Sequence, residues 1–179
     1  MTPDGQWIVT EINSNQKTGV DTWLSPTKGA EPPVKYLSTP FNERQARLAP
    51  GAQWIAYVSD ESGRNEVYVD SFPRPGNHTL VSTNGGTLPI WRKDGAELYY
   101  IGLNGDLLAV PVTMGPTGFH NSPPQVLYAA PALPFRSDGQ RSVYAVLGKG
   151  DRFIFAAITH AAQPRGISVL MNWITDVEK

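Results

Sequence analysis

Short runs of hydrophobic residues, each about as long as a β-strand, alternate along the chain with turns rich in glycine and proline. Trp54–Val58 and Phe153–Ile158 are examples, and neither approaches the roughly 20 apolar residues that a membrane helix needs. The runs are nearly continuous rather than cleanly alternating with polar residues, which is typical of strands buried on both faces. The pattern therefore predicts an all-β chain whose sheets pack against one another.

An internal repeat divides these runs into units. Pro3–Val9 recurs as Pro50–Ala56, a period of about 47 residues, and weaker copies begin at Lys93 and Lys149. In each copy a turn precedes an apolar strand. In the first copy proline fixes φ at the second turn position and glycine takes the position with positive φ, whereas Pro50-Gly51 in the second copy suits a type II turn. Such periods are typical of β-propeller blades. We expect one propeller region, 1–179, with blade units of about 1–40, 41–86, 87–130 and 131–179.

The units supply three, four, four and three strands, so we expect about three and a half four-stranded antiparallel blades. The predicted strands are Trp7–Ile12, Asp21–Ser25, Val34–Ser38, Arg44–Ala49, Gln53–Ser59, Glu66–Ser71, His78–Ser82, Leu88–Arg92, Glu97–Gly102, Asp106–Val112, Gln125–Tyr128, Ser142–Leu147, Arg152–Ile158 and Ile167–Trp173. Closed propellers have about 4–8 blades. The chain is therefore expected to form part of a ring, or a ring that a second copy completes.

Four local features carry further expectations. Asn104-Gly105 predicts a type I′ hairpin turn, and Met114–Pro124 is read as a loop that lengthens the third unit. Pro111 lies inside a predicted strand, where a proline removes a backbone donor, so a bulge or a strand end is expected there. Glu43–Leu48 can also be read as one helical turn, although the repeat favours a strand.

Composition and charge narrow the function classes. The formal net charge of −1 gives no electrostatic basis for binding a nucleic acid or inserting at an anionic membrane. The absence of cysteine excludes a disulfide scaffold, a thiol nucleophile and a cysteine-ligated metal. The first residues have neither a basic nor an apolar region, so no signal peptide is expected in this chain, and a cytoplasmic location stays open.

Candidate catalytic chemistry is sparse, and neither a catalytic residue nor a metal ligand nor a cofactor is assigned. His78, His120 and His160 lie far apart, which predicts surface histidines. No Gly-x-Ser-x-Gly motif occurs, and Ser25–Lys28, which matches Ser-x-x-Lys, lies at a predicted hairpin turn rather than at a helix start. The acidic run Asp60–Glu66 could offer oxygen ligands to Ca²⁺, but its arginine favours a solvated hairpin loop with a local ion pair.

The tryptophans suggest two roles. Trp7 and Trp54 recur with the repeat, so we expect them in the core between blades. Residues at the ends of innermost strands should instead face the propeller channel, where a partner or ligand would bind, or where they would fill the channel with hydrogen bonds. The candidate binding residues are Arg44, Arg47, Trp91, Arg92 and Tyr144.

Three stretches carry a family resemblance: Pro3–Ile8, Trp54–Val69 and Trp91–Tyr100 resemble the PD40 (WD40-like) repeat of TolB-like β-propellers. Ser168–Trp173 is similar to the end of the propeller in certain bacterial serine/threonine kinases. The chain departs from the repeat at Gly51-Ala52, where Asp-Gly is usual, and in an eroded fourth copy.

This resemblance implies a docking or sensing propeller in an exported protein, periplasmic or otherwise outside the cytoplasm, of which the chain is the C-terminal part. It implies a protein partner at one propeller face or at the channel mouth. The repeat-matched strands and the missing nucleophile and metal motifs favour a non-enzymatic module that binds a protein or a small ligand. The alternative hypothesis is a hydrolase of esters, lactones or peptides with its site at the channel mouth.

Overall fold

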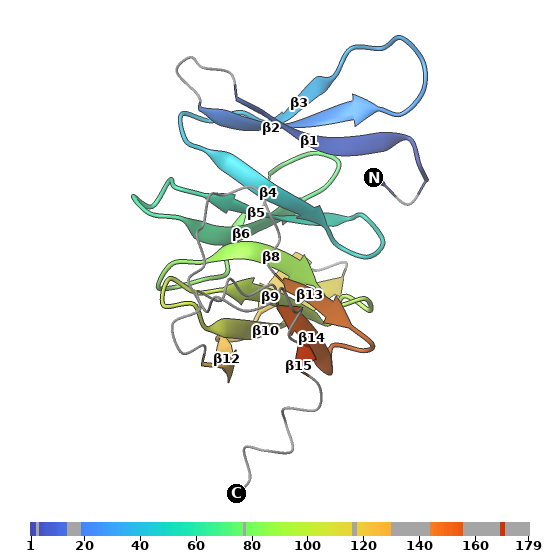
Figure 1. Ribbon diagram of the computed structural model, residues 1–179. Helices are drawn as coiled ribbons and strands as arrows, with labels where there is room; N and C mark the ends of the chain where they lie inside the picture. The colour runs from blue at the N-terminus through green and yellow to red at the C-terminus, as the bar shows by residue number, and fades with distance from the viewer. Residues whose placement is uncertain are drawn as a thin grey trace, which may run out of the picture.

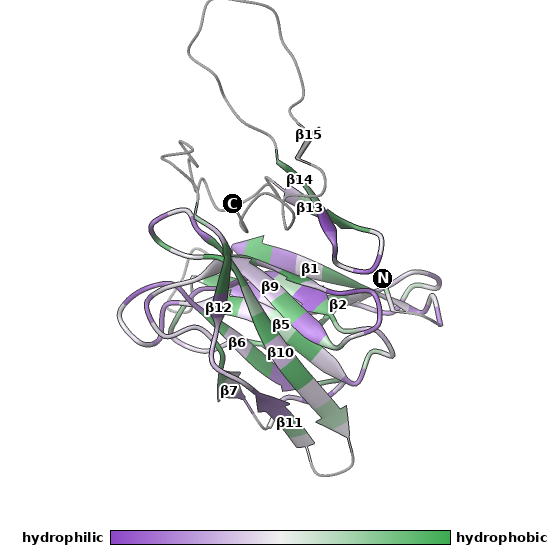
Figure 2. Cartoon of the chain, turned by 90° about the horizontal axis from the view of Figure 1, so that it is seen from below, coloured by the Kyte–Doolittle hydropathy of each residue, from purple (hydrophilic) through white to green (hydrophobic). Residues whose placement is uncertain are grey.

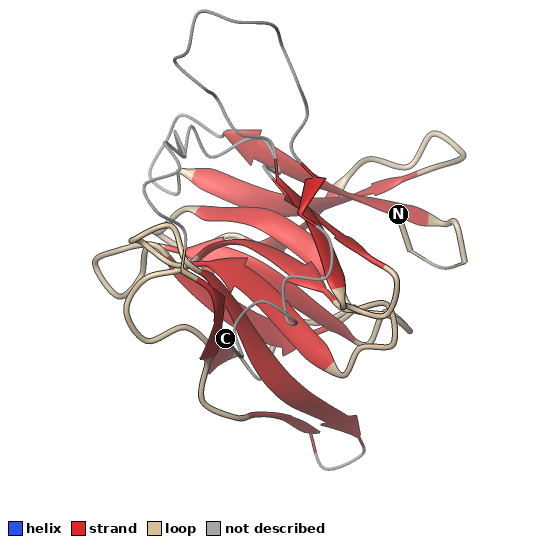
Figure 3. Ribbon diagram, turned by 60° about the horizontal axis from the view of Figure 1, so that its bottom comes forward, coloured by secondary structure: helices blue, strands red, loops and turns tan. Residues whose placement is uncertain are grey.

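The computed structural model describes residues 1–2, 4–13, 19–76, 78–115, 118–129, 144–155 and 169–170. Its described elements are all β-strands, joined by turns and loops, and every pairing between them is antiparallel (Figure 3). The all-β prediction is confirmed. Within these residues, no helix has the length and apolarity to cross a membrane.

Within the described residues, four sheets follow one another in chain order. The first two are β1 (Trp7–Asn13), β2 (Val20–Pro26) and β3 (Val34–Leu37), then β4 (Glu43–Leu48), β5 (Trp54–Ser59), β6 (Glu66–Ser71) and β7 (Thr79–Leu80). The third contains β8 (Thr87–Trp91), β9 (Glu97–Ile101), β10 (Leu107–Gly115), β11 (Gly118–Asn121) and β12 (Gln125–Tyr128). The fourth contains β13 (Tyr144–Leu147), β14 (Arg152–Phe155) and β15 (Val169–Leu170).

Neighbouring sheets pack face to face, and the first strands of the first three sheets, β1, β4 and β8, lie side by side (Figure 1). One apolar cluster lies between each pair of successive sheets. The cluster between the second and third sheets contains Trp54, Val58, Val69, Trp91, Leu98 and Phe119. Strand β5 is buried along its whole length, as the continuous apolar runs predict, and β10 carries a long hydrophobic stretch in Figure 2. The architecture is a partial β-propeller.

The repeated turn keeps one hydrogen bond and one left-handed position in all four copies, and the second copy adds a further positive φ of 84° at Gly51, as a type II turn at Pro50-Gly51 requires. Gly5, Gly95 and Gly150 have φ of 68°, 76° and 91°, and each donates its N–H to the carbonyl three residues earlier. Ala52 occupies the same place and also has positive φ, 48°, with its N–H 2.9 Å from the carbonyl oxygen of Ala49. A position that suits glycine is therefore held by a residue with a Cβ.

The turn at Asn104-Gly105 is not the predicted type I′ turn. Positive φ occurs at Gly105, 89°, but not at Asn104. The N–H of Gly105 bonds the carbonyl of Gly102 at 3.0 Å, and the N–H of Gly102 bonds the carbonyl of Asp106 at 2.9 Å, so the loop is one residue longer. This is a type I turn followed by a left-handed glycine. The amide of Asn104 supports it by bonding the carboxylate of Asp106 at 2.5 Å.

The predicted loop Met114–Pro124 was also wrong in part. β10 continues to Gly115 and pairs with β11, which places Met114 opposite Phe119. Phe119 is buried against Trp54 and Trp91, so this hairpin contributes to the core.

The strand neither ends nor bulges at Pro111. Pro111 is the last residue of β10 that pairs with β9, and the pairing with β11 begins at Val112. The backbone N–H that proline lacks is therefore absent at the point where pairing with β9 ends and pairing with β11 begins.

Candidate functional site

A cavity of about 400 Å³ opens between the second and third sheets, where β4 and β8 end. Its walls include Arg47, Leu48, Ile90, Trp91, Arg92 and Lys93. Three of the five residues predicted to bind a partner are therefore brought together here: Arg47, Trp91 and Arg92. Arg44 and Tyr144 do not belong to the cavity wall.

Matched bulges shape the two strands that carry the cavity. The register of β4 shifts between Arg44 and Arg47, and that of β8 shifts between Thr87 and Ile90. Each bulge contains a non-glycine residue with positive φ: Gln45 at 57° and Leu88 at 56°. The helical reading of Glu43–Leu48 is thus wrong. A bulge reverses the alternation of side chains along a strand. Beyond each bulge, it therefore changes which side chains of β4 and β8 face the neighbouring sheet.

The side-chain amide of Gln45 joins the two bulges. Its Oε1 atom accepts the backbone N–H of Leu88 at 2.6 Å and the hydroxyl of Thr87 at 2.8 Å. Gln45 is 5% exposed, so these bonds form away from water and satisfy a buried donor. The walls of the cavity are consequently held in one relative position.

Trp91 is a wall of the cavity and also a core residue. It is 8% exposed, and its ring packs edge-on against Phe119 with centroids 6.3 Å apart. Its indole N–H donates to the carbonyl of Arg47 at 2.9 Å. The expected channel-facing side chain is therefore largely committed to packing, and little of its ring remains for stacking on a ligand.

The cationic groups at the cavity differ in their partners. Arg92 pairs with Asp94 at 2.6 Å and with Glu97 at 2.9 Å, and the bond from Arg92 lowers the pKa of Asp94. Arg47 is exposed and donates to the carbonyl of Ala46 at 2.9 Å. No acidic side chain among the described residues pairs with Arg47 or with exposed Lys93. The cavity rim therefore carries uncompensated positive charge, and sequence reasoning missed the contribution of Lys93.

Tyr144 is placed in the core rather than at a channel surface. It is 4% exposed, stacks on Phe155, and donates its hydroxyl to the carbonyl of Leu88 at 2.9 Å. Burial raises the pKa of Tyr144 far above its ordinary value. The bulge at Leu88 turns a backbone oxygen toward the fourth sheet, and the tyrosine satisfies it. The channel-facing expectation for Tyr144 is corrected accordingly.

Arg44 lies on β4 opposite Val58, half-buried, and its Nε atom has no hydrogen-bond partner among the described residues. It lies near Asp60. Burial of Asp60 raises the pKa of its carboxyl, but bonds from Asn42 and the charge of Arg44 outweigh burial and leave the pKa lowered. Arg44 therefore acts on the loop after β5 and not on the cavity.

The residues weighed for catalysis are not assembled. Ser25 lies on β2 with its hydroxyl 3.1 Å from that of Thr10, whereas exposed His120 lies on β11 of the third sheet. His78 is exposed as predicted, and His160 lies outside the described residues. The hydrolase hypothesis remains a prediction.

The acidic loop forms the expected local ion pair. Arg64 Nε lies 2.6 Å from Glu66 Oε1, which also accepts the N–H of Gly85 at 2.9 Å. Glu66 is buried, so this carboxylate holds the loop after β7 in place.

Comparisons with known proteins agree with the architecture. No family model matches the sequence, and no curated protein does. The structure of TolB from Agrobacterium tumefaciens superposes with a TM-score of 0.53 at 11% identity, over 70% of this chain and 48% of that one. The chain has a TolB-like β-propeller fold. TolB from Acinetobacter baumannii matches with a TM-score of 0.49 at 21% identity, over 65% of this chain and 30% of that one.

These likenesses concern the TolB-like fold alone, and the chain spans about half of the length of the Agrobacterium protein. The kinase-like stretch Ser168–Trp173 lies outside the described residues except for Val169–Leu170, and that similarity stays a prediction.

Proposed function

We propose that this chain is a non-enzymatic docking module that holds an acidic peptide segment of a protein partner in the cavity between β4 and β8. The observation that carries the proposal is the unpaired positive charge of Arg47 and Lys93 beside the apolar wall of Leu48, Ile90 and Trp91. An arginine guanidinium binds a carboxylate through two parallel hydrogen bonds. The apolar wall adds contact area for the aliphatic part of the peptide.

The neighbouring charges support this choice of partner. Arg92 already pairs with two carboxylates and serves to position the wall. Among the described residues, exposed Arg47 has only a carbonyl partner. A cationic ligand would meet repulsion from both Arg47 and Lys93. A neutral small ligand would leave these charges unused, so an acidic segment fits the cavity best.

The test measures binding of a fluorescein-labelled hexaglutamate peptide by fluorescence anisotropy, with a neutral hexaglutamine peptide as reference. The wild-type chain should prefer hexaglutamate, and Arg47→Glu should weaken that binding by about 100-fold, since hydrogen-bonded charge pairs contribute about 1.5–3 kcal/mol and reversal adds repulsion. Arg74→Glu, an equal charge change at an exposed residue outside the cavity lining, should have a small effect. Equal binding of the two peptides, or unchanged binding by Arg47→Glu, would overturn the proposal.

Ring completion by a second copy belongs to the same proposal. Four sheets are at the lower limit for a closed propeller. The face of β1 turned away from the second sheet carries Ile8 and Ile12, which are 42% and 38% exposed. The fourth sheet of a second copy would cover these side chains and give a ring of eight sheets. The exported parent implied by the resemblance would present the cavity outside the cytoplasm.

A further inference from the structure

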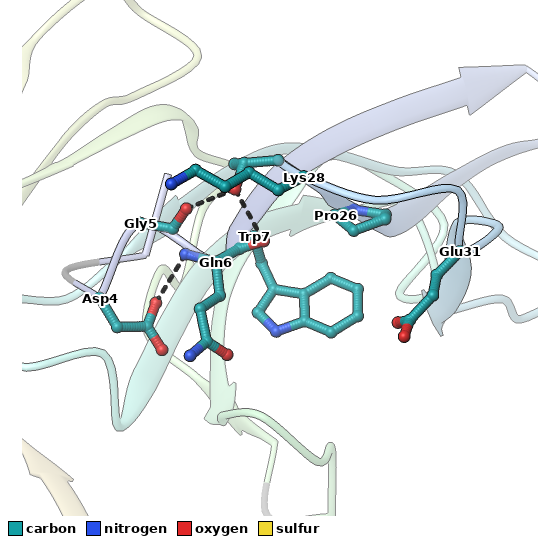
Figure 4. A pocket seen from close by; sticks show the side chains of 8 residues that line it. Asp4, Gly5, Gln6, Trp7, Pro26, Lys28 and Glu31 are labelled. Atoms are coloured by element: carbon teal, nitrogen blue, oxygen red, sulfur yellow. Dashed lines mark hydrogen bonds between the residues drawn. The ribbon is translucent and has the colours of Figure 1, made fainter.

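A second cavity, of about 410 Å³, lies at the turn end of the first sheet (Figure 4), and its lining shares no residue with that of the Arg47 cavity. Its lining includes Asp4, Gln6, Trp7, Pro26, Lys28 and Glu31. In Figure 4 the indole ring of Trp7 lies between the side chains of Gln6 and Glu31. The cavity thus combines an aromatic surface with polar side chains at its edges.

The ring of Trp7 is less covered by other side chains than the ring of Trp54, the tryptophan at the equivalent place in the second unit. Trp54 is 8% exposed, and Phe119 covers its ring at a centroid distance of 5.7 Å. Trp7 packs one side against the core between the first two sheets but is only partly buried. The expectation of a core residue therefore holds fully for Trp54 and partly for Trp7, whose remaining surface lines the cavity.

The backbone around Trp7 is fixed by hydrogen bonds. Asp4 accepts the hydroxyl of Thr2 and the N–H of Gln6, the latter at 3.0 Å, and the bond from Thr2 lowers the pKa of Asp4. On the other side of the cavity, the N–H of Thr27 donates to the carbonyl of Gln6 at 2.9 Å. The turn and the end of β2 are thereby joined, which pre-organises the cavity before a ligand arrives.

The polar groups at the edge are available and of mixed character. In the part of the chain that the structure describes, the side chains of Gln6, Lys28 and Glu31 have no hydrogen-bond or ionic partner. Glu31 and Asp4 accept hydrogen bonds, Lys28 donates, and the amide of Gln6 does both. An anion would be repelled by the carboxylates and a cation by Lys28, so a neutral ligand with many hydroxyl groups suits the set.

We infer that this cavity binds a neutral saccharide, with one pyranose ring stacked on Trp7 and its hydroxyl groups bonded to Gln6, Lys28 and Glu31. The C–H face of a pyranose is apolar and flat enough to pack on an indole, while each hydroxyl both donates and accepts. This cavity shares no lining residue with the cavity proposed to dock an acidic peptide. Either proposal can therefore fail without the other.

The test is saturation-transfer NMR of the full chain with three neutral probes: maltotriose, cellotriose and chitotriose. At least one should receive saturation on the C–H protons of a single ring. Trp7→Ala should weaken its binding about tenfold, which corresponds to the loss of an aromatic contact of about 1.5 kcal/mol, and Trp7→Phe should restore part of it. Arg74→Glu, at an exposed residue outside both cavity linings, should leave saccharide binding unchanged.

Because Trp7→Ala could reduce binding by disturbing the fold, variants at exposed positions test the cavity without changing the core. The double variant Gln6→Ala/Glu31→Ala alters two exposed side chains and should also weaken binding. Gln53→Ala is the matched control, because Gln53 is equally exposed and stands before the covered Trp54 as Gln6 stands before Trp7. The inference is overturned if none of the probes receives saturation, if binding survives the double variant, or if tetramethylammonium or acetate binds more tightly than every saccharide.

Discussion

Ala52 offers the sharpest test of how the repeat directs folding, through the substitution Ala52→Gly. Its φ of 48° places Cβ in the left-handed region that glycine occupies at the three equivalent turns. A Cβ in that region costs about 1–2 kcal/mol relative to the right-handed region. Glycine removes this strain but adds about 0.5–1 kcal/mol of unfolded-state entropy. We therefore expect Ala52→Gly to raise the free energy of unfolding by about 0.5–1 kcal/mol.

The assay is urea and thermal unfolding followed by circular dichroism. In a chain of this size, 1 kcal/mol shifts Tm by about 2–4 °C, so the gain is measurable. Ala96→Gly is the matched control: Ala96 is exposed, follows Gly95 in the equivalent turn of the third sheet, and is not among the residues with positive φ. This control should lower the stability by about 0.5–1 kcal/mol. If both variants lower Tm equally, the left-handed strain assigned to Ala52 is refuted.

Two further predictions concern a buried carboxyl and the assembly. Burial raises the pKa of Glu43 above its ordinary value of 4.5, with Asp21 and Asp60 adding to the effect and bonds from Thr39 opposing it. The stability of the folded chain is therefore lost as the pH rises through that raised pKa. Glu43→Gln should raise Tm near neutral pH but not below pH 4.5. A gain in Tm that does not depend on pH would contradict this prediction. Light scattering should give twice the chain mass, and Ile12→Glu should halve it, whereas a monomer at every concentration would rule out the two-copy ring.

Much of the fold could be predicted because its signals are local. Glycine and proline mark the turns, and the continuous apolar run of Trp54–Val58 indicates burial on both faces, which the structure confirms. The β10–β11 hairpin was not predictable from such signals. Its segment contains glycines and a proline that resemble a loop, and it is stabilised by contacts of Phe119 with tryptophans distant in sequence.

The candidate site was predictable only in part, for a geometric reason. The ends of innermost strands were expected to face a channel, and Arg47, Trp91 and Arg92 do meet at one cavity. The bulge at Leu88 is invisible in the sequence, since leucine rarely adopts positive φ. It shifts the alternation of β8 and supplies the carbonyl that binds Tyr144, which sequence reasoning assigned to the channel.

The bond from Gln45 to Leu88 has a consequence for what the Arg47 cavity can report. One wall belongs to the second sheet and the other to the third, and the amide of Gln45 bonds across them beside the indole N–H of Trp91. Sliding or splaying of the two sheets would break that bond and deform the cavity at the same time. If an acidic peptide binds both walls, as proposed, its occupancy would report whether the second and third sheets are docked.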